Sequence, residues 1–501
     1  MEVPLRRHGA ASIIAADMTT PRSRAAAPAA APTTRSVSPA PAVSGSAPGN
    51  GFSYSRGVFE ELVDRALAHA RKLGATDAGA EASEGCGLSV SVRKGELETV
   101  ERNRDKSLGV TVYIGHRRGN ASTSDFSTRA IEQTVQAAYD IARFTAEDPV
   151  AGLPDEADVA APGTHRDLDL FHPWSITSED AARIALECEE AALRTHKRIT
   201  NSEGASVSAQ QSHFFSAHTR GFRGGYASSR HSLSVAPIAS MPGRNAEMQR
   251  DAWYTSMRSA EALSSPAAVG RYAAERALSR LGSRKIPTTE CPVLFESPLA
   301  AGLLGAFTQA VSGGALYRKS TFLLDSMGQR VFPEHIHIDE DPFIARGKGS
   351  SPFDEEGVRV SPRKVVDAGE VQGYFLSSYS ARKLGMQTTG NAGGSHNLVL
   401  TSRLTRPEDD LDAMLKKLGT GLFVIELMGQ GVNYVTGDYS RGASGFWVEN
   451  GEIAFPVHEI TIASNMKDML QGIEAVGADA YNYGAKTVGS ILVNRMKVAG
   501  S

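Results

Sequence analysis

Hydrophobic and polar positions change their period near the start of the chain. Apolar residues recur at helical spacing from Val58 to Ala70, and Gly74 follows as a stop signal, which predicts a helix. The pattern then alternates with a period of two over residues 88–92 and again over 97–101. The Lys94-Gly95 pair between these stretches predicts a tight turn, so the two segments are expected to form a hairpin.

A further strand and a second helix complete this region. Residues 109–115 read as another buried strand, and the spacing over 128–146 predicts a helix that Pro149 closes. The inward face of this helix is expected to carry Ile131, Val135, Ala138 and Ile141. The order of helix, strands and helix is typical of an α+β unit, for which we expect a mixed sheet.

The middle of the chain continues the pattern after a connection rich in proline and aspartate at residues 149–175. A helix is expected from Ser178, with acidic residues placed favourably in its first turn. Short alternating segments between 205 and 240 predict an antiparallel meander, and a helix is expected near 266–281.

The composition shifts again after Cys291, where the chain becomes rich in glycine and in strand patterns. Helices are expected here only at about 298–312, 407–418 and 464–476. We therefore divide the folded chain into an amino-terminal α+β domain at 53–286 and a strand-rich carboxyl-terminal domain at 287–501.

The first 52 residues differ from both domains. They are rich in alanine, proline and serine, which predicts a disordered tail. The short apolar run at 12–16 is too small for a secretory signal. An arginine-rich, acid-poor start also suits an organelle transit peptide, and a start at Met18 is a further alternative.

Bulk composition excludes some classes of function. The 501 residues are 41% hydrophobic and 22% charged, as in globular proteins, and no apolar run is long enough to span a membrane. A net charge of −3 disfavours direct binding to nucleic acid. Three distant cysteines form no CxxC pair, which favours a reducing compartment, and we expect a cytoplasmic protein.

Histidines provide the candidate metal ligands. His213 and His218 are expected to be partly exposed residues of a strand. His335, His337 and Asp339 would share one face of a strand, where they could grip zinc; alternatively, they are the solvated side of a strand that buries its isoleucines, which we favour. The His458-Glu459 pair lacks the second histidine of a zincin motif.

Phosphate-binding and nucleophile motifs are not found. The sequence has no GxGxxG or GxxxxGK[ST] after a predicted strand and no GxSxG elbow. Nothing marks a cysteine as a nucleophile. These patterns give no reason to expect a nucleotide cofactor or a serine or cysteine hydrolase.

Several longer stretches resemble the TldD/PmbA family of zinc metallopeptidases, whose members were also described as modulators of DNA gyrase. The resemblance covers about residues 55–501 and both domains in order. It is carried by these segments: Gly109-Val-Thr-Val-Tyr113, Arg118-Gly-Asn-Ala-Ser-Thr-Ser124, Phe353-Asp-Glu-Glu-Gly-Val358, Val371-Gln-Gly-Tyr-Phe375, Ala381-Arg-Lys-Leu-Gly385, Thr389-Gly-Asn-Ala-Gly-Gly394 and residues 431–457.

TldD-type chains of this family carry HExxxH on a helix and a late cysteine as a third metal ligand. Aligned on Arg318-Lys319, the two histidine positions fall on Gly305 and Ala310, and the glutamate position on Ala306. The late cysteine falls near Val488. None of these side chains has a donor atom, so the chain resembles the PmbA (TldE) branch. We therefore assign no catalytic, metal-binding or cofactor-binding residue to it.

The resemblance implies a heterodimer with a TldD-type subunit that holds the zinc and cleaves unstructured peptides. This chain would then shape half of the peptide cleft. A set of glycines could allow close backbone approach there or could be ordinary turn residues: Gly429, Gly431, Gly437, Gly442 and Gly445. Two alternatives stay open, a metallopeptidase with a displaced site at His335, His337 and Asp339, and a binding protein for gyrase or DNA.

Overall fold

The computed structural model describes residues 51–161, 163, 166–243 and 246–500. The predicted tail therefore lies outside the described residues, except for its last two positions. Of these, Phe52 is buried, with its ring 5.5 Å from the ring of Phe171 and 4.1 Å from that of His213. The packed part of the chain thus includes Phe52, and the tail prediction extended too far.

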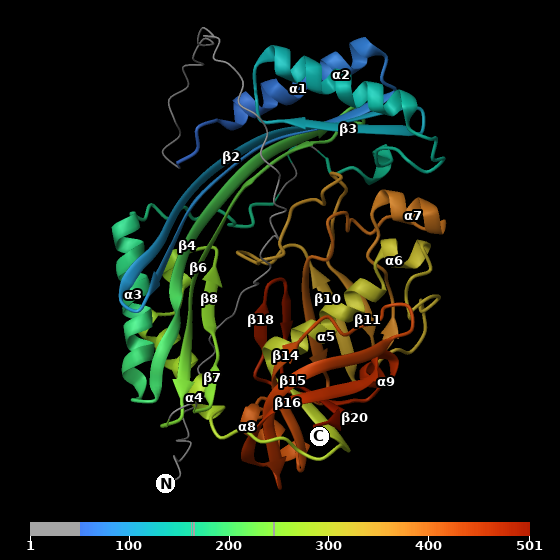
Figure 1. Ribbon diagram of the computed structural model, residues 1–501. Helices are drawn as coiled ribbons and strands as arrows, with labels where there is room; N and C mark the ends of the chain where they lie inside the picture. Colours follow the sequence, from blue (N-terminus) through green and yellow to red (C-terminus); the bar gives the residue numbers. More distant parts are fainter. Residues whose placement is uncertain (1–50, 162, 164–165, 244–245, 501) are drawn as a thin grey trace.

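The amino-terminal half is built on one long, curved sheet that arches over the rest of the molecule (Figure 1). Its strand order is β3-β2-β1-β4-β6-β7, with β5 on β4 and β8 on β6. The bounds are β1 Asp77–Arg93, β2 Glu96–Ile114, β3 Arg117–Thr123, β4 Ile199–His218, β5 Arg223–Gly224, β6 Ala227–Ser240, β7 Met248–Arg250 and β8 Trp253–Met257. All pairings between these strands are antiparallel. The α+β class is confirmed, but the mixed sheet was wrong.

The strands are longer than the sequence predicted. Residues 109–115 are the end of β2 and not a separate strand, and most of 205–240 belongs to two long strands, β4 and β6. Residues 96–105 of β2 are exposed on both faces, so no alternation of buried positions marks this part of the strand.

Four helices cover the convex face of this sheet. Helices α1 (Arg56–Leu73) and α2 (Thr128–Phe144) pack on one end, and α3 (Ser178–Thr195) and α4 (Pro266–Ser279) pack on the other. All four were predicted, and Gly74 ends α1 with the expected left-handed conformation. Ile141, expected to face inward on α2, is 47% exposed, and Ala142 is buried instead.

The concave face of the sheet is polar. Buried alanine, leucine and valine side chains of β1 face the helices, so the alternate positions, among them Glu81, Ser83 and Ser89, lie on the other face. Neighbouring strands repeat this pattern, and the hydroxyl oxygens of Ser89 and Ser208 lie 3.2 Å apart. The sheet therefore presents hydroxyl groups and carboxylates to the carboxyl-terminal half.

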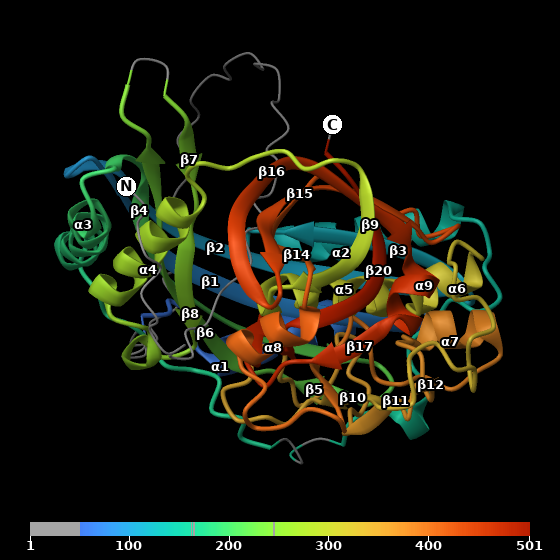
Figure 2. The ribbon, with the colours of Figure 1, turned by 90° about the horizontal axis from the view of Figure 1, so that it is seen from below.

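The carboxyl-terminal half contains a closed five-stranded barrel, seen end-on in Figure 2. The barrel consists of β9 Thr289–Phe295, β14 Gly421–Met428, β15 Asp438–Glu449, β16 Glu452–Asn465 and β20 Ile491–Ala499, and β17 Ile473–Val476 pairs with β20. A second sheet has the order β12-β11-β10-β13-β19-β18. Its bounds are β10 Ile336–Asp341, β11 Arg363–Asp367, β12 Glu370–Val371, β13 Asn397–Ser402, β18 Tyr481–Tyr483 and β19 Lys486–Val488.

Helices are few in this half, as predicted, but two were missed. The expected helices correspond to α5 (Ser297–Ala310), α8 (Leu411–Leu418) and α9 (Met466–Gln471). The missed ones are α6 (Gly313–Tyr317) and α7 (Ser378–Leu384), each capped by a serine side chain. They are too short to show a hydrophobic period. No helix in the described ranges is long and apolar enough to cross a membrane.

Ion pairs and hydrogen bonds between partly buried side chains join the two halves. Arg276 of α4 pairs with Glu296, next to α5, and its Nε lies 3.2 Å from Asp251. On the far side of the junction, the Tyr379 hydroxyl of α7 donates to Asp148 at 2.7 Å. These contacts hold the concave sheet against the carboxyl-terminal half.

Candidate functional site

A groove begins between the concave sheet and the carboxyl-terminal half and continues into that half. It consists of three adjoining cavities of about 780, 260 and 620 Å³, of which the third is lined by the carboxyl-terminal half alone. Glu81 and Glu355 line both the first and the second cavity, and residues 392–395 line both the second and the third. The space is large enough for several residues of an extended chain.

The third cavity contains Gly305, the first of the positions that the sequence alignment places at the metal ligands of TldD-type chains. Gly305 of α5 lines this cavity beside Lys486 of β19. A Cβ atom added at Gly305 would lie 3.5 Å from Lys486 Cε and 3.9 Å from Nζ. A lysine of the chain itself therefore occupies the space next to this position.

The other positions belong to the hydrophobic core. Ala306, Ala310 and Val488 are all buried in one cluster, where α5 packs against β19. Their side chains carry no nitrogen, oxygen or sulfur, so this set does not fit a zinc ion. Elsewhere in the described part of the chain, no group of three or more His, Cys, Asp or Glu residues is placed to hold a metal.

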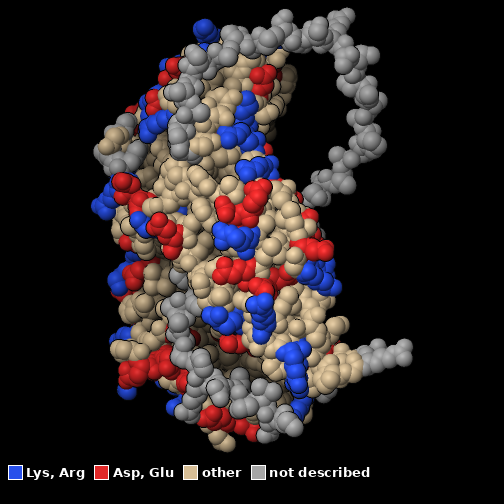
Figure 3. Space-filling model, turned by 90° about the vertical axis from the view of Figure 1, so that its left-hand side faces the viewer, with Lys and Arg blue, Asp and Glu red and all other residues tan. Residues whose placement is uncertain are grey.

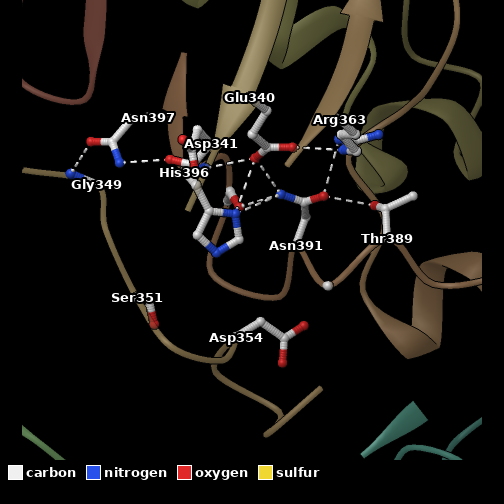
Figure 4. Close-up of polar contacts among 12 residues, drawn as sticks. Glu340, Asp341, Gly349, Ser351, Asp354, Arg363, Thr389, Asn391, His396 and Asn397 are labelled. Atoms are coloured by element: carbon white, nitrogen blue, oxygen red, sulfur yellow. Dashed lines mark hydrogen bonds and ion pairs between the residues drawn. The ribbon is translucent and has the colours of Figure 1, made fainter. Parts of the chain in front are cut away.

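A buried polar network supports the loop at residues 389–396, whose residues 392–395 lie between the second and third cavities. Glu340, at the end of β10, accepts hydrogen bonds from Arg363 Nε at 2.7 Å, from Asn391 Nδ2 at 2.8 Å and from the backbone N–H of His396 at 2.7 Å (Figure 4). Asn391 also accepts from the Thr389 hydroxyl at 2.7 Å. Both ends of the loop are thus tied to one carboxylate.

The charge of Glu340 is stabilised in place. Burial disfavours the ionised carboxylate, but hydrogen bonding to His396 and the positive charge of Arg363 outweigh burial and lower the pKa of Glu340 to about 2. The pKa of Asp354, near the same loop, is shifted in the opposite direction. Its burial raises the pKa to about 7, although it accepts hydrogen bonds from the N–H groups of Val358 and Ala392.

The backbone of residues 392–395 lines the groove. Gly393 and Gly394 both have positive φ, +92° and +116°, which side chains other than hydrogen rarely tolerate. Within the described residues, the N–H groups of Gly393 and Ser395 have no hydrogen-bond acceptor. Unpaired backbone donors beside a cavity are suited to contact another backbone.

Alanine substitutions at the two glycines should separate strain from crowding. We expect Gly394→Ala to lower the free energy of unfolding by about 1–2 kcal/mol through backbone strain alone, because its Cβ meets nothing within 4 Å. Gly393→Ala should cost about 0.5–1 kcal/mol more, because its Cβ would lie 2.5 Å from the carboxyl carbon of Glu355. Urea unfolding of both variants measures the difference; equal losses would contradict the crowding.

The histidines at the start of β10, His335 just before the strand and His337 within it, have structural partners. Both ring nitrogens of His335 have partners, Ser402 Oγ at 2.9 Å and the carbonyl oxygen of Ile473 at 3.1 Å. His337 Nδ1 lies 2.9 Å from Asp367. Ile336 and Ile338 are buried, as the favoured interpretation of this strand predicted.

His213 and His218 are buried, so the predicted exposure was wrong. His213 is 8% exposed, stacks on Phe59 at 4.6 Å and lies 3.5 Å from Glu84. Burial lowers its pKa in spite of the Glu84 carboxylate. Burial also lowers the pKa of His218 to about 4. His213 is covered by α1 and by Phe52, whereas the ring of His218 lies 5.6 Å from that of Phe222. The strand pattern alone could not indicate either contact.

The glycines proposed for the cleft lie in the barrel region. Gly429 and Gly437 have positive φ, at turns beside β14 and β15. A Cβ at Gly431 would lie 1.6 Å from the carbonyl oxygen of Ser440, and one at Gly445 1.9 Å from that of Phe423. Since none of these glycines lines the three cavities, close approach within the chain explains them better.

The groove also contains charged residues that sequence reasoning missed. Arg258 and Lys348 line the second cavity together with Glu81 and Glu355. They come from the two halves of the chain, and no motif links them. Only the packing of the carboxyl-terminal half under the sheet brings them together.

Comparison with known proteins agrees with this architecture. The chain matches three family profiles in order: PmbA/TldA metallopeptidase domain 1 at 80–142, the central domain at 171–281 and the C-terminal domain at 288–500. It is 48% identical over 447 residues to metalloprotease PmbA of Escherichia coli O157:H7, covering 89% of this chain and 97% of that protein. It is 45% identical to the PmbA homolog of Haemophilus influenzae, with coverage of 88% and 97%.

Solved structures share the fold. A crystal structure from Bacteroides thetaiotaomicron, whose name suggests a modulator of DNA gyrase, superposes with a TM-score of 0.82 at 25% identity, covering 88% of this chain and 99% of the other. TldE from Thermococcus kodakarensis gives 0.74 at 17% identity, with coverage of 88% and 100%, and supports the fold alone. By sequence and domain order, this chain belongs to the PmbA/TldD metallopeptidase family and is similar to its PmbA members.

Proposed function

We propose that this chain is the non-catalytic, PmbA-like subunit of a cytoplasmic metallopeptidase complex that cleaves unstructured peptides. The observation that carries the proposal is the chemistry at the four family metal positions. Gly305, Ala306, Ala310 and Val488 offer no ligand and no carboxylate base, whereas zinc hydrolysis needs both. The zinc would belong to a TldD-type partner.

The groove supports a role in receiving the peptide. Its walls combine hydroxyl groups of the concave sheet, among them Ser216 and Ser228, with the backbone of the 392–395 loop. An extended peptide carries its own N–H and C=O groups, and such walls can bind them whatever the side chains are. A folded protein could not enter the groove, which agrees with a preference for unstructured substrates.

Reconstitution tests this function. The purified chain is mixed with a TldD-type partner that carries HExxxH, and cleavage of an unfolded peptide and bound zinc are measured for each chain and for the mixture. We expect cleavage from the mixture alone, about one zinc per pair, and loss of cleavage after chelation. Stoichiometric zinc and cleavage in the isolated chain would contradict the proposal.

Neither alternative function is favoured by an observation in the groove. A displaced metal site would have to break the hydrogen bonds of His335 and the contact of His337 with Asp367. Elemental analysis of the wild type and of a variant with both histidines replaced by alanine checks this site. Direct binding to DNA is disfavoured because acidic and basic side chains are interspersed on the face shown in Figure 3, and a gel shift at low salt tests it.

A further inference from the structure

In the part of the chain that the structure describes, two neighbouring cations of the second cavity have only backbone hydrogen-bond partners. Arg258 is 9% exposed and donates to three carbonyl oxygens, those of Gly347 at 3.1 Å, Ser229 at 3.3 Å and Lys348 at 3.2 Å. The Nζ of Lys348 lies 3.4 Å from the carbonyl oxygen of Asn482. Within the described ranges, neither residue forms an ion pair with a carboxylate.

This arrangement is electrostatically unfavourable without a ligand. Burial, together with the charge of Arg230, lowers the pKa of Arg258 to about 10. Burial and the charges of Arg230 and Arg258 lower the pKa of Lys348 to about 8. Cations held together in a partly closed cavity are relieved by an anion, and an arginine beside a lysine forms short, charge-assisted hydrogen bonds to a carboxylate.

Carboxylates of the same cavity do not neutralise the two cations. Glu81 of β1 and Glu355 line the cavity with their side chains open to it, and neither forms an ion pair within the described part of the chain. Burial and the adjacent charge of Glu355 raise the pKa of Glu81. The cavity is therefore lined by two carboxylates, which would repel an incoming carboxylate, and by two cations, Arg258 and Lys348, that form no ion pair with them.

We propose that Arg258 and Lys348 bind a carboxylate of the extended substrate peptide and so set its position along the groove. This inference rests on the proposed function and adds a substrate feature to it. Two sources share the chemistry, the α-carboxylate at the end of the peptide and an aspartate or glutamate side chain within it. Repulsion from Glu81 and Glu355 disfavours any position of either carboxylate except in contact with Arg258 and Lys348.

The test uses this chain in complex with its TldD-type partner, in which the glutamate of HExxxH is replaced by glutamine so that bound peptide is not cleaved. Fluorescently labelled, unstructured peptides of one sequence are compared by anisotropy. They are the free acid, the C-terminal amide, and versions of both in which every acidic side chain is replaced by its amide. The variant is Lys348→Gln, and the control is Lys467→Gln, an exposed lysine of α9 outside the three cavities.

We expect Lys348→Gln to weaken binding of the carboxylate peptide about 10-fold, the size of one charge-assisted hydrogen bond, and to leave the carboxylate-free peptide unchanged. If the C-terminal amide binds more weakly than the free acid, the bound group is the α-carboxylate. If replacing the acidic side chains by amides weakens binding, the bound group is an aspartate or glutamate side chain. Lys467→Gln should change nothing. Arg258→Lys, which keeps the charge, gives a second variant, with thermal melting as a check on folding.

The outcomes separate this inference from the proposed function. If peptides bind equally well with and without carboxylates, and Lys348→Gln has no effect, the carboxylate site is overturned while the peptide groove stands. If Lys348→Gln weakens all peptides alike, the residue acts structurally and the site is also overturned. If no peptide binds the complex at all, both proposals fail.

Discussion

Replacing Glu340 by glutamine should lower the free energy of unfolding by about 3–5 kcal/mol. Glutamine keeps the shape of the side chain but leaves the partly buried guanidinium of Arg363 without its counter-charge. The amide NH₂ of glutamine would also face a group that donates to Glu340 in the wild type, which places two donors against each other. These groups belong to Arg363, Asn391 and His396. The loop at 389–396 would lose its anchor.

The control for this variant is Asp339→Asn on the same strand, which should change stability by no more than about 0.5 kcal/mol, because Asp339 is only partly buried. The effect should also depend on pH. The pKa of Glu340 is lowered from 4.5 to about 2, so its stabilisation is present above pH 4.5 and is lost as pH falls through 2. Urea unfolding at pH 7, 5 and 3 measures both; a loss below about 1 kcal/mol at pH 7 would contradict the role of the network.

Local pattern was enough to predict those parts of the fold that depend on near neighbours. The four helices of the amino-terminal half have a clear apolar face, and each has an N-cap serine or threonine, such as Ser127 of α2 and Thr177 of α3. The Lys94-Gly95 turn was predicted from its position between two alternating stretches, and Gly95 adopts a positive φ of 79° there without steric cost. The family followed from motifs spread over both halves.

Contacts over long sequence distances were beyond such reasoning. Glu340 and His396 are 56 positions apart, and no motif joins them. The burial of His213 depends on Phe52, which lies in a stretch that composition assigned to the tail. Arg258 and Lys348 meet only because the carboxyl-terminal half packs under the sheet. The groove and its charges are therefore products of tertiary packing.

The four positions aligned with the metal ligands of TldD-type chains were predictable in part. Sequence alone established that Gly305, Ala306, Ala310 and Val488 lack donor atoms. It could not tell whether the space around them stays open or is packed. Gly305 lines the third cavity beside Lys486, but the other three side chains are part of the core, so the packing leaves little room for ligands at those three positions.

Restoring a single ligand should therefore be costly. We expect Ala310→His to lower the free energy of unfolding by about 3–5 kcal/mol, because Ala310 is 0% exposed and the imidazole would overpack the core and bury an unpaired N–H. Zinc should not recover the loss, since one nitrogen is too few for a stable site. Urea unfolding with and without zinc measures both effects.

The neighbouring Gln309 provides the matched control. It is exposed on the same helix and lines the third cavity, so Gln309→His should change stability by no more than about 0.5 kcal/mol. If Ala310→His were as stable as the wild type, or if zinc stabilised it, the position would be open and the loss of metal ligands would be a matter of a few side chains. A large loss at Ala310 beside a small one at Gln309 would instead mean that the packing of α5 against β19 leaves no room for a metal ligand at position 310.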